Sequence, residues 1–123
     1  MISYSISDQP RIIMVTYSGV VNKDEIVEYI NKIILDKTLP KNILILSNAL
    51  KASLDINQSD LPVLANIVRL SLDKFNTVRE AFVHNSPLGV AYTMIFGIAV
   101  NDSRYKCKVF STEVAAKKWL ASE

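Results

Sequence analysis

The sequence predicts an α/β fold built on a mixed, mostly parallel β-sheet, with elements in the order β-β-α-β-α-β-α-β-α. Two observations carry this prediction. Short segments with the alternating or continuous apolar pattern of strands recur along the chain, and single segments with helical spacing separate them. Strands that alternate with single helices are typical of parallel sheets with right-handed crossovers. Because the chain has 123 residues and a mass of 13.8 kDa, we expect residues 1–123 to form one domain.

The first two strands are predicted to pair as a hairpin. Apolar residues alternate with serine over residues 2–7, which is the period of a half-buried strand. Residues 8–10 (Asp-Gln-Pro) are a turn signal, and residues 11–17 are rich in β-formers, so we expect a second strand that Gly19 ends. The first strand is expected to run antiparallel to its neighbour at an edge of the sheet.

The first helix is predicted to begin at Asn22 and to end before Pro40. The Asn22 side chain can cap a free amide while Glu25 reaches back three residues later, and isoleucines follow at helical spacing. The apolar run 43–46 then predicts a strand covered on both faces. Residues 47–58 are expected to be irregular.

Three further helices are predicted from their starts. A serine with a proline in the first turn begins one helix over residues 59–62 and another at residues 86–87. Ser111 or Thr112 can cap a last helix. Between these helices, the pattern of residues 78–83 predicts one strand, and residues 109–110 close another.

The composition excludes several classes of protein and site. The residues are 50% hydrophobic and 21% charged, with 3 glycines and 4 prolines, which excludes a disordered or collagen-like chain. A single cysteine excludes an internal disulfide, and one cysteine with one histidine excludes a standard zinc site. The net charge of +2 is far below that of a nucleic-acid-binding domain. We expect no metal, no cofactor and no nucleic-acid partner.

Targeting and membrane signals are also missing from the sequence. The N-terminal residues lack the basic and long apolar regions of a signal peptide, and no apolar run has the roughly 18 residues that a membrane span needs. Together with a free cysteine, these features indicate a cytoplasmic protein with no integral membrane segment.

Candidate binding residues lie at the predicted carboxyl ends of the strands, where open α/β sheets bind ligands. His84, Asn85 and Ser86 follow one strand; a serine at a helix start can present a hydroxyl and amides to an anion, or can simply cap the helix. His84 is the single histidine, and no G-x-S-x-G sequence surrounds any serine, so no nucleophile–base pair can be assembled. Cys107 is expected to fill the core. We therefore expect no catalytic residues and no enzymatic activity.

The unusual feature of the sequence is the helix predicted over residues 87–100, because residues 81–101 contain no Asp, Glu, Lys or Arg. On a helical wheel, the side expected to meet the sheet carries Leu88, Ala91, Tyr92, Ile95 and Ala99. The opposite side carries Gly89, Thr93, Phe96, Gly97 and Val100. A helix that is apolar all round is normally buried on more than one side, so neighbours in the fold, a second copy of the chain, or a lipid or other partner covers it. Small residues permit close approach, which favours self-association through this second side.

Three stretches, together with the order of the elements, resemble the STAS domain family related to SpoIIAA, and most of all its small stand-alone bacterial branch, described as STAS/SEC14-like. They are residues 19–24 (GVVNKD), residues 86–89 (SPLG) and residues 108–120 (KVFSTEVAAKKWL). The resemblance covers nearly the whole chain. It implies a non-enzymatic bacterial domain with a SpoIIAA-like fold.

The resemblance also bears on partners. Signalling relatives bind a kinase or anti-sigma partner and are switched by phosphorylation of a serine at the start of the second helix, whereas lipid-carrying relatives enclose an apolar pocket. Ser53 and Ser59 lie in the corresponding region and are the candidate phosphoacceptor or partner-binding residues, although the Asp-Ser-x-Gly type of motif is absent.

Taken together, these features predict a non-enzymatic binding or interaction module, regulatory in kind, that forms a homodimer through the uncharged helix 87–100. A regulatory protein is a further expected partner. The alternative is a carrier or sensor of a small apolar ligand, such as a lipid or fatty acid. The two hypotheses differ in what covers the uncharged helix.

Overall fold

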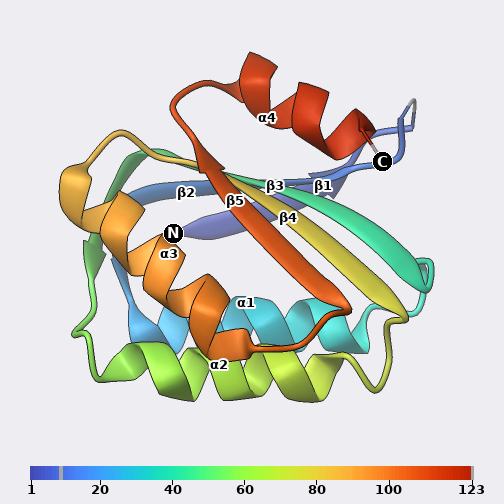
Figure 1. The fold of residues 1–123 in the computed structure, drawn as a ribbon, viewed down its shortest axis with the longest axis horizontal. Coiled ribbons are helices and arrows are strands. Elements are labelled where there is room, and N and C mark those ends of the chain that lie inside the picture. The colour runs from blue at the N-terminus through green and yellow to red at the C-terminus, as the bar shows by residue number, and fades with distance from the viewer. Residues whose placement is uncertain (9, 123) are drawn as a thin grey trace.

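The computed structural model describes residues 1–8 and 10–122, and its elements follow the predicted order (Figure 1). In chain order they are β1 (Ile2–Ile6), β2 (Ile13–Asn22), α1 (Lys23–Leu35), β3 (Asn42–Asp55), α2 (Asp60–Ser71), β4 (Thr77–Val83), α3 (Pro87–Val100), β5 (Tyr105–Phe110) and α4 (Glu113–Ala121).

The strands form one mixed sheet in the order β1-β2-β3-β4-β5. β1 pairs antiparallel with β2 at one edge, and each later strand pairs parallel with the strand before it, which confirms the predicted edge strand and the mostly parallel sheet. α1, α2 and α3 cover one face of the sheet and α4 covers the other (Figure 1). The face under α1–α3 is called the three-helix face below.

β2 and β3 run further than the sequence analysis predicts. Gly19 does not end β2; it adopts a left-handed backbone with φ of +68°, close to a shift in the register of the β2–β3 pair, and β2 continues to Asn22. Glycine adopts a positive φ at little cost, so the strand can bend there without ending. The prediction of irregular structure over residues 47–58 was wrong as well, because β3 continues to Asp55, where it pairs with Asn22.

Capping hydrogen bonds confirm three of the predicted helix starts. The Glu25 amide donates to Asn22 Oδ1 at 2.9 Å and the Asn22 amide donates to Glu25 Oε1 at 3.4 Å, which completes a capping box at α1. At α3, Ser86 Oγ accepts from the Gly89 amide at 3.3 Å. Thr112 caps α4 in the same way. These side chains satisfy amides that a helix leaves unpaired in its first turn.

A basic side chain from elsewhere in the chain pairs with the carboxyl-terminal carbonyls of each of the four helices. Lys74 does so for α1, and Arg104 does so for α2. Arg69 donates to the carbonyls at the end of α3, and Arg79 donates to those at the end of α4. The accepting carbonyls are those of Ile33, Ile34 and Asp36 (α1), Leu72 (α2), Ala99 and Val100 (α3), and Trp119 and Ser122 (α4). A cation at this end of a helix is stabilising because unpaired carbonyls there carry the negative end of the helix dipole.

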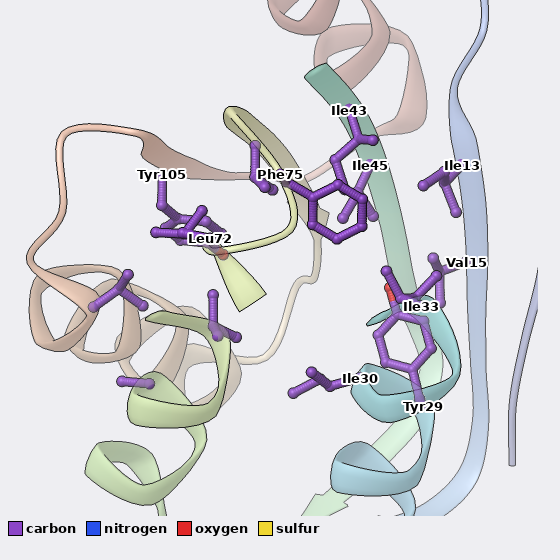
Figure 2. Packing of buried hydrophobic residues seen from close by; sticks show 14 of the residues in the cluster. Ile13, Val15, Tyr29, Ile30, Ile33, Ile43, Ile45, Leu72, Phe75 and Tyr105 are labelled. Carbon is purple, nitrogen blue, oxygen red and sulfur yellow. The ribbon is translucent and has the colours of Figure 1, made fainter. Parts of the chain in front are cut away.

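Hydrophobic side chains fill both sides of the sheet. The larger core lies on the three-helix face, and Figure 2 shows Ile30 and Ile33 of α1 and Ile43 and Ile45 of β3 gathered in it. The smaller core lies under α4 and consists of Ile12, Leu46, Ala81, Val83, Ala116 and Leu120. The two cores follow from the alternation of side chains along each strand.

The structure corrects the orientation of α3. The side assigned to self-association faces the sheet, and it consists of Gly89, Thr93, Phe96, Gly97 and Val100. The side predicted to meet the sheet is largely exposed, with Leu88 57% and Ile95 38% accessible. Because α3 has no charged residue, its hydrophobic pattern does not distinguish the two sides.

Two glycines bring α3 close to the sheet. A Cβ atom added to Gly89 would overlap the His84 ring, and one added to Gly97 would lie 2.5 Å from Cys107 Sγ. Atoms of this size pack best at about 3.5–4.0 Å. The small residues of α3 therefore serve its packing on β4 and β5.

We expect Gly97→Ala to lower the free energy of unfolding by about 1–3 kcal/mol, because the added methyl group would overlap Cys107 Sγ. In a Cys107→Ala background the same substitution should be neutral or should stabilise by up to about 1 kcal/mol, since alanine favours helix more than glycine does. Urea unfolding of the wild type, both single variants and the double variant measures this coupling. Equal effects of Gly97→Ala in the two backgrounds would contradict the contact.

Candidate functional site

A cavity of about 110 Å³ lies on the three-helix face, between the sheet and α1, α2 and α3. Its walls are mostly aliphatic and aromatic side chains. They include Ile26, Ile30 and Ile33 of α1, Leu61, Leu64 and Val68 of α2, Tyr92 and Phe96 of α3, and Ile43, Ile45 and Ala49 of β3. An apolar cavity of roughly 150 Å³ can stay dry and accept benzene. The space described here therefore suits an apolar molecule of a few heavy atoms.

One carboxyl group, that of Glu80 on β4, lies in this apolar cavity. Glu80 is only 7% accessible, and both of its oxygens accept a hydrogen bond from a hydroxyl. Ser47 Oγ donates to Oε2 at 2.8 Å, and the Tyr105 hydroxyl donates to Oε1 at 2.6 Å. The three residues stand on the neighbouring strands β3, β4 and β5. They form a buried polar group, called the Glu80 cluster below.

The Glu80 cluster lies in surroundings without positive charge. Among the residues that the structure describes, the cavity lining contains no lysine or arginine. Burial raises the pKa of Glu80 above its usual value, and the hydrogen bonds from Tyr105 and Ser47 only partly oppose this shift. Burial also raises the pKa of Tyr105, so its hydroxyl stays neutral. Because the Ser47 hydroxyl can accept as well as donate, the cluster can keep its contacts whether Glu80 is protonated or ionised.

His84 lines the same cavity at the end of β4. It is buried, and its Nδ1 accepts a hydrogen bond from the Ser86 amide at 3.3 Å, which assigns the proton of the neutral ring to Nε2. Burial lowers the pKa of His84 below its usual value, so the ring is uncharged near neutral pH. His84 therefore brings a hydrogen-bonding group to the cavity without bringing charge.

The structure separates the three residues predicted as a site at the strand end. His84 lines the cavity, Asn85 is exposed, and the Ser86 hydroxyl accepts from the Gly89 amide. Ser86 therefore caps α3, which is the second of the two roles that the sequence analysis offered for it. Of the three residues, only His84 belongs to the cavity lining.

Ser53 and Ser59, the predicted phosphoacceptors, lie outside the cavity lining. Ser53 is exposed near the end of β3. Ser59 is exposed just before α2, and its side chain makes no capping hydrogen bond. Phosphorylation of either residue, or its contact with a partner protein, stays a prediction.

The sequence analysis missed the Glu80 cluster, although a signal for Glu80 was present. The period-two set that runs from Val78 through Phe82 to His84 has Glu80 in its middle. A carboxyl group at an inward position of a strand is rare, and it marks a candidate site. Ser47 and Tyr105 gave no such signal, because they lie 33 and 25 residues from Glu80 in the sequence and meet it only in the folded sheet.

Within residues 1–8 and 10–122, no group of three or more His, Cys, Asp or Glu side chains is placed to hold a metal ion. No helix in the same part of the chain combines the length and the apolar character that crossing a bilayer requires.

We expect Glu80→Gln to weaken the pH dependence of stability. Because the pKa of Glu80 is raised in the folded protein, protonation of Glu80 stabilises the fold. This contribution to the free energy of unfolding is fully present below the usual pKa of 4.5, and it is lost as the pH rises through the pKa that Glu80 has in the folded protein. The wild type should therefore lose stability relative to Glu80→Gln as the pH rises from the usual pKa of 4.5 through the raised pKa of the folded protein.

Urea unfolding across that pH range measures the difference, and Glu28→Gln is the matched control. Glu28 is an exposed carboxyl that pairs with Lys32, so its replacement should produce no comparable change. If the gap between Glu80→Gln and the wild type stays constant with pH, the pKa of Glu80 is not raised.

No protein-family model matches the sequence, and no curated protein matches it significantly. Among solved structures, the fold is similar to that of an uncharacterized protein from the DUF3478 family of Shewanella loihica PV-4, described as having a SpoIIAA-like fold. The comparison has a TM-score of 0.61, covers 98% of this chain and 94% of that chain, and shows 17% sequence identity. A likeness at this identity concerns the fold alone. This chain has a SpoIIAA-like α/β fold, as its resemblance to the STAS family implies.

Proposed function

We propose that this chain is a non-enzymatic binding domain that holds a small apolar ligand in the cavity beneath α1, α2 and α3. The observation that carries the proposal is the cavity itself, about 110 Å³ of space walled by apolar side chains. Protein interiors otherwise leave few voids larger than a water molecule. A concave apolar space with a few polar groups is also the usual form of a small-molecule site. Of the two hypotheses drawn from the sequence, the geometry supports the ligand-binding one better.

The polar groups of the cavity support binding more than catalysis. Both Glu80 oxygens are engaged by hydroxyls, and the His84 ring accepts its hydrogen bond from a backbone amide, not from a nucleophile. Burial raises the pKa of Cys107 to about 11, which keeps its thiol protonated. A domain that binds its ligand unchanged fits a carrier or sensor in the bacterial cytoplasm, the location that the sequence indicates.

We expect Ala49→Leu to fill the cavity and block ligand uptake. Ala49 lines the cavity from β3, so the larger side chain would occupy empty space and change the free energy of unfolding by no more than about 1 kcal/mol. Ala81→Leu is the matched control. Ala81 is fully buried in the core under α4, outside the cavity lining, and overpacking there should cost about 1–3 kcal/mol.

Urea unfolding measures the two stability changes, and NMR titration with benzene measures uptake by the wild type and by Ala49→Leu. Benzene should shift the amide signals of cavity-lining residues in the wild type and leave those of Ala49→Leu in place. If the wild type does not take up benzene, or if Ala49→Leu is as destabilising as Ala81→Leu, the cavity is not a ligand site.

Self-association through α3 is a second candidate, and the outer face of α3 favours it. This outer face consists of Leu88, Met94, Ile95 and Ile98, all exposed. Ile98 is 77% accessible, and α3 contains no charged residue. Exposed apolar patches mark contact surfaces more often than the rest of a protein surface does. A second copy of the chain or a regulatory protein would meet this outer face, and not the glycine-bearing side that the sequence analysis assigned to the interface.

If the outer face of α3 forms a dimer, we expect Ile98→Glu to raise the dimer dissociation constant about tenfold or more, because an interface would bury an unpaired carboxylate. Val114→Glu is the control, since Val114 is 65% accessible and lies on α4, across the sheet from α3 (Figure 1). Sedimentation equilibrium gives the dissociation constants. A wild type that stays monomeric, or a dimer indifferent to Ile98→Glu, would rule out this interface.

A further inference from the structure

We propose that the cavity selects ligands whose polar end donates a hydrogen bond, an alcohol or an amine, and that it excludes carboxylates such as fatty acids. This inference rests on the proposed function, because it names the class of ligand that the same cavity takes. The observation behind it is the Glu80 cluster, in which a buried carboxyl group is surrounded by hydroxyls and apolar side chains.

The hydroxyls of the cluster are already engaged, whereas Glu80 has acceptor capacity left. Ser47 and Tyr105 each direct their one hydroxyl hydrogen at a Glu80 oxygen. An ionised carboxyl group offers about four lone-pair positions, and these two bonds use one on each oxygen. A ligand that donates therefore finds an acceptor at Glu80. A ligand that only accepts would have to draw a hydroxyl away from it.

Within the described residues, every element packed around Glu80 presents uncharged side chains to it. The titratable neighbours on β2, α1 and β5 are phenols and one thiol, namely Tyr17, Tyr29, Tyr105 and Cys107. Burial raises the pKa of each of them, so all are neutral near pH 7. α2 and α3 contribute only uncharged lining residues, and His84 is neutral as well. Among the described residues that line the cavity, there is therefore no cation that could pair with an anionic ligand.

The absence of a cation among the described residues around Glu80 favours alcohols and amines over carboxylates as ligands. A carboxylate bound beside ionised Glu80 would bring two negative groups together, so one of the two would have to take up a proton before the ligand could bind. An alcohol can donate to Glu80 whether that residue is ionised or protonated. An ammonium group donates as well, and it supplies the positive charge that the cluster lacks. Alcohols and amines thus share one mode of recognition at Glu80.

The test is an NMR titration of the full chain at pH 7 with four probes of about six heavy atoms, a size suited to the cavity: benzene, 1-pentanol, pentylamine and pentanoate. We expect 1-pentanol or pentylamine to bind about tenfold more tightly than pentanoate, and more tightly than benzene. Benzene carries no polar end, so it reports on the cavity independently of Glu80.

Two variants test the assignment to Glu80. Glu80→Gln should weaken pentylamine binding about tenfold and reduce the disadvantage of pentanoate, while 1-pentanol keeps an acceptor in the amide oxygen. Ser47→Ala frees one Glu80 oxygen, so both donor probes should bind at least as tightly as they bind the wild type. The control Glu28→Gln changes an exposed carboxyl outside the cavity and should leave all four affinities unchanged.

The outcomes separate this inference from the proposed function. If benzene binds and pentanoate binds as tightly as either donor probe, the selectivity is overturned and the ligand cavity stands. If benzene does not bind, the proposed function fails and the inference, which rests on it, fails with it. If the preference for donors survives unchanged in Glu80→Gln, or if Ser47→Ala abolishes it, Glu80 is not the group that recognises the ligand.

Discussion

Each helix is held at its carboxyl-terminal end by a cation from another part of the chain, and the arrangement of the three-helix face depends on these contacts. α2 is central, because Arg69 within it pairs with the end of α3, and Lys74 just after it pairs with the end of α1. Arg104 in turn holds the end of α2. The three helices are thereby joined to one another along the edge where β3, β4 and β5 begin. The cavity lies between these joined helices and the sheet.

Glu80 makes this arrangement less stable than it could be. Burying a carboxyl group without a cation is unfavourable, and an apolar residue of similar volume is often neutral or stabilising at such a position. The hydrogen bonds from Ser47 and Tyr105 offset part of that cost. Natural proteins keep such locally unfavourable residues mainly at functional sites. This reasoning connects the polar cluster to the cavity that contains it.

Most of the fold could be predicted from the sequence because its signals are local. The caps at Asn22, Ser86 and Thr112 lie within three residues of the amides that they bind, and each was visible as a short motif. The extent of β3 depends instead on pairing with β2, which no local pattern reports. The orientation of α3 was out of reach because a helix without charge has no polar side to identify. The cavity and the partners of Glu80 depend on contacts between strands, so the sequence offered only the inward position of Glu80 itself.

The close contact between Gly97 and Cys107 makes the single cysteine a reporter of α3. Burial raises the pKa of Cys107 to about 11, so the thiol is almost entirely protonated at pH 7. Alkylating reagents attack the thiolate, so this side chain reacts slowly while α3 covers it. Separation of α3 from β5 would return water to the sulfur and restore an ordinary thiol pKa. Cys107 is half-buried, so it also reacts slowly while α3 stays in place, and an increase of its alkylation rate above that level reports the separation of α3 from the sheet.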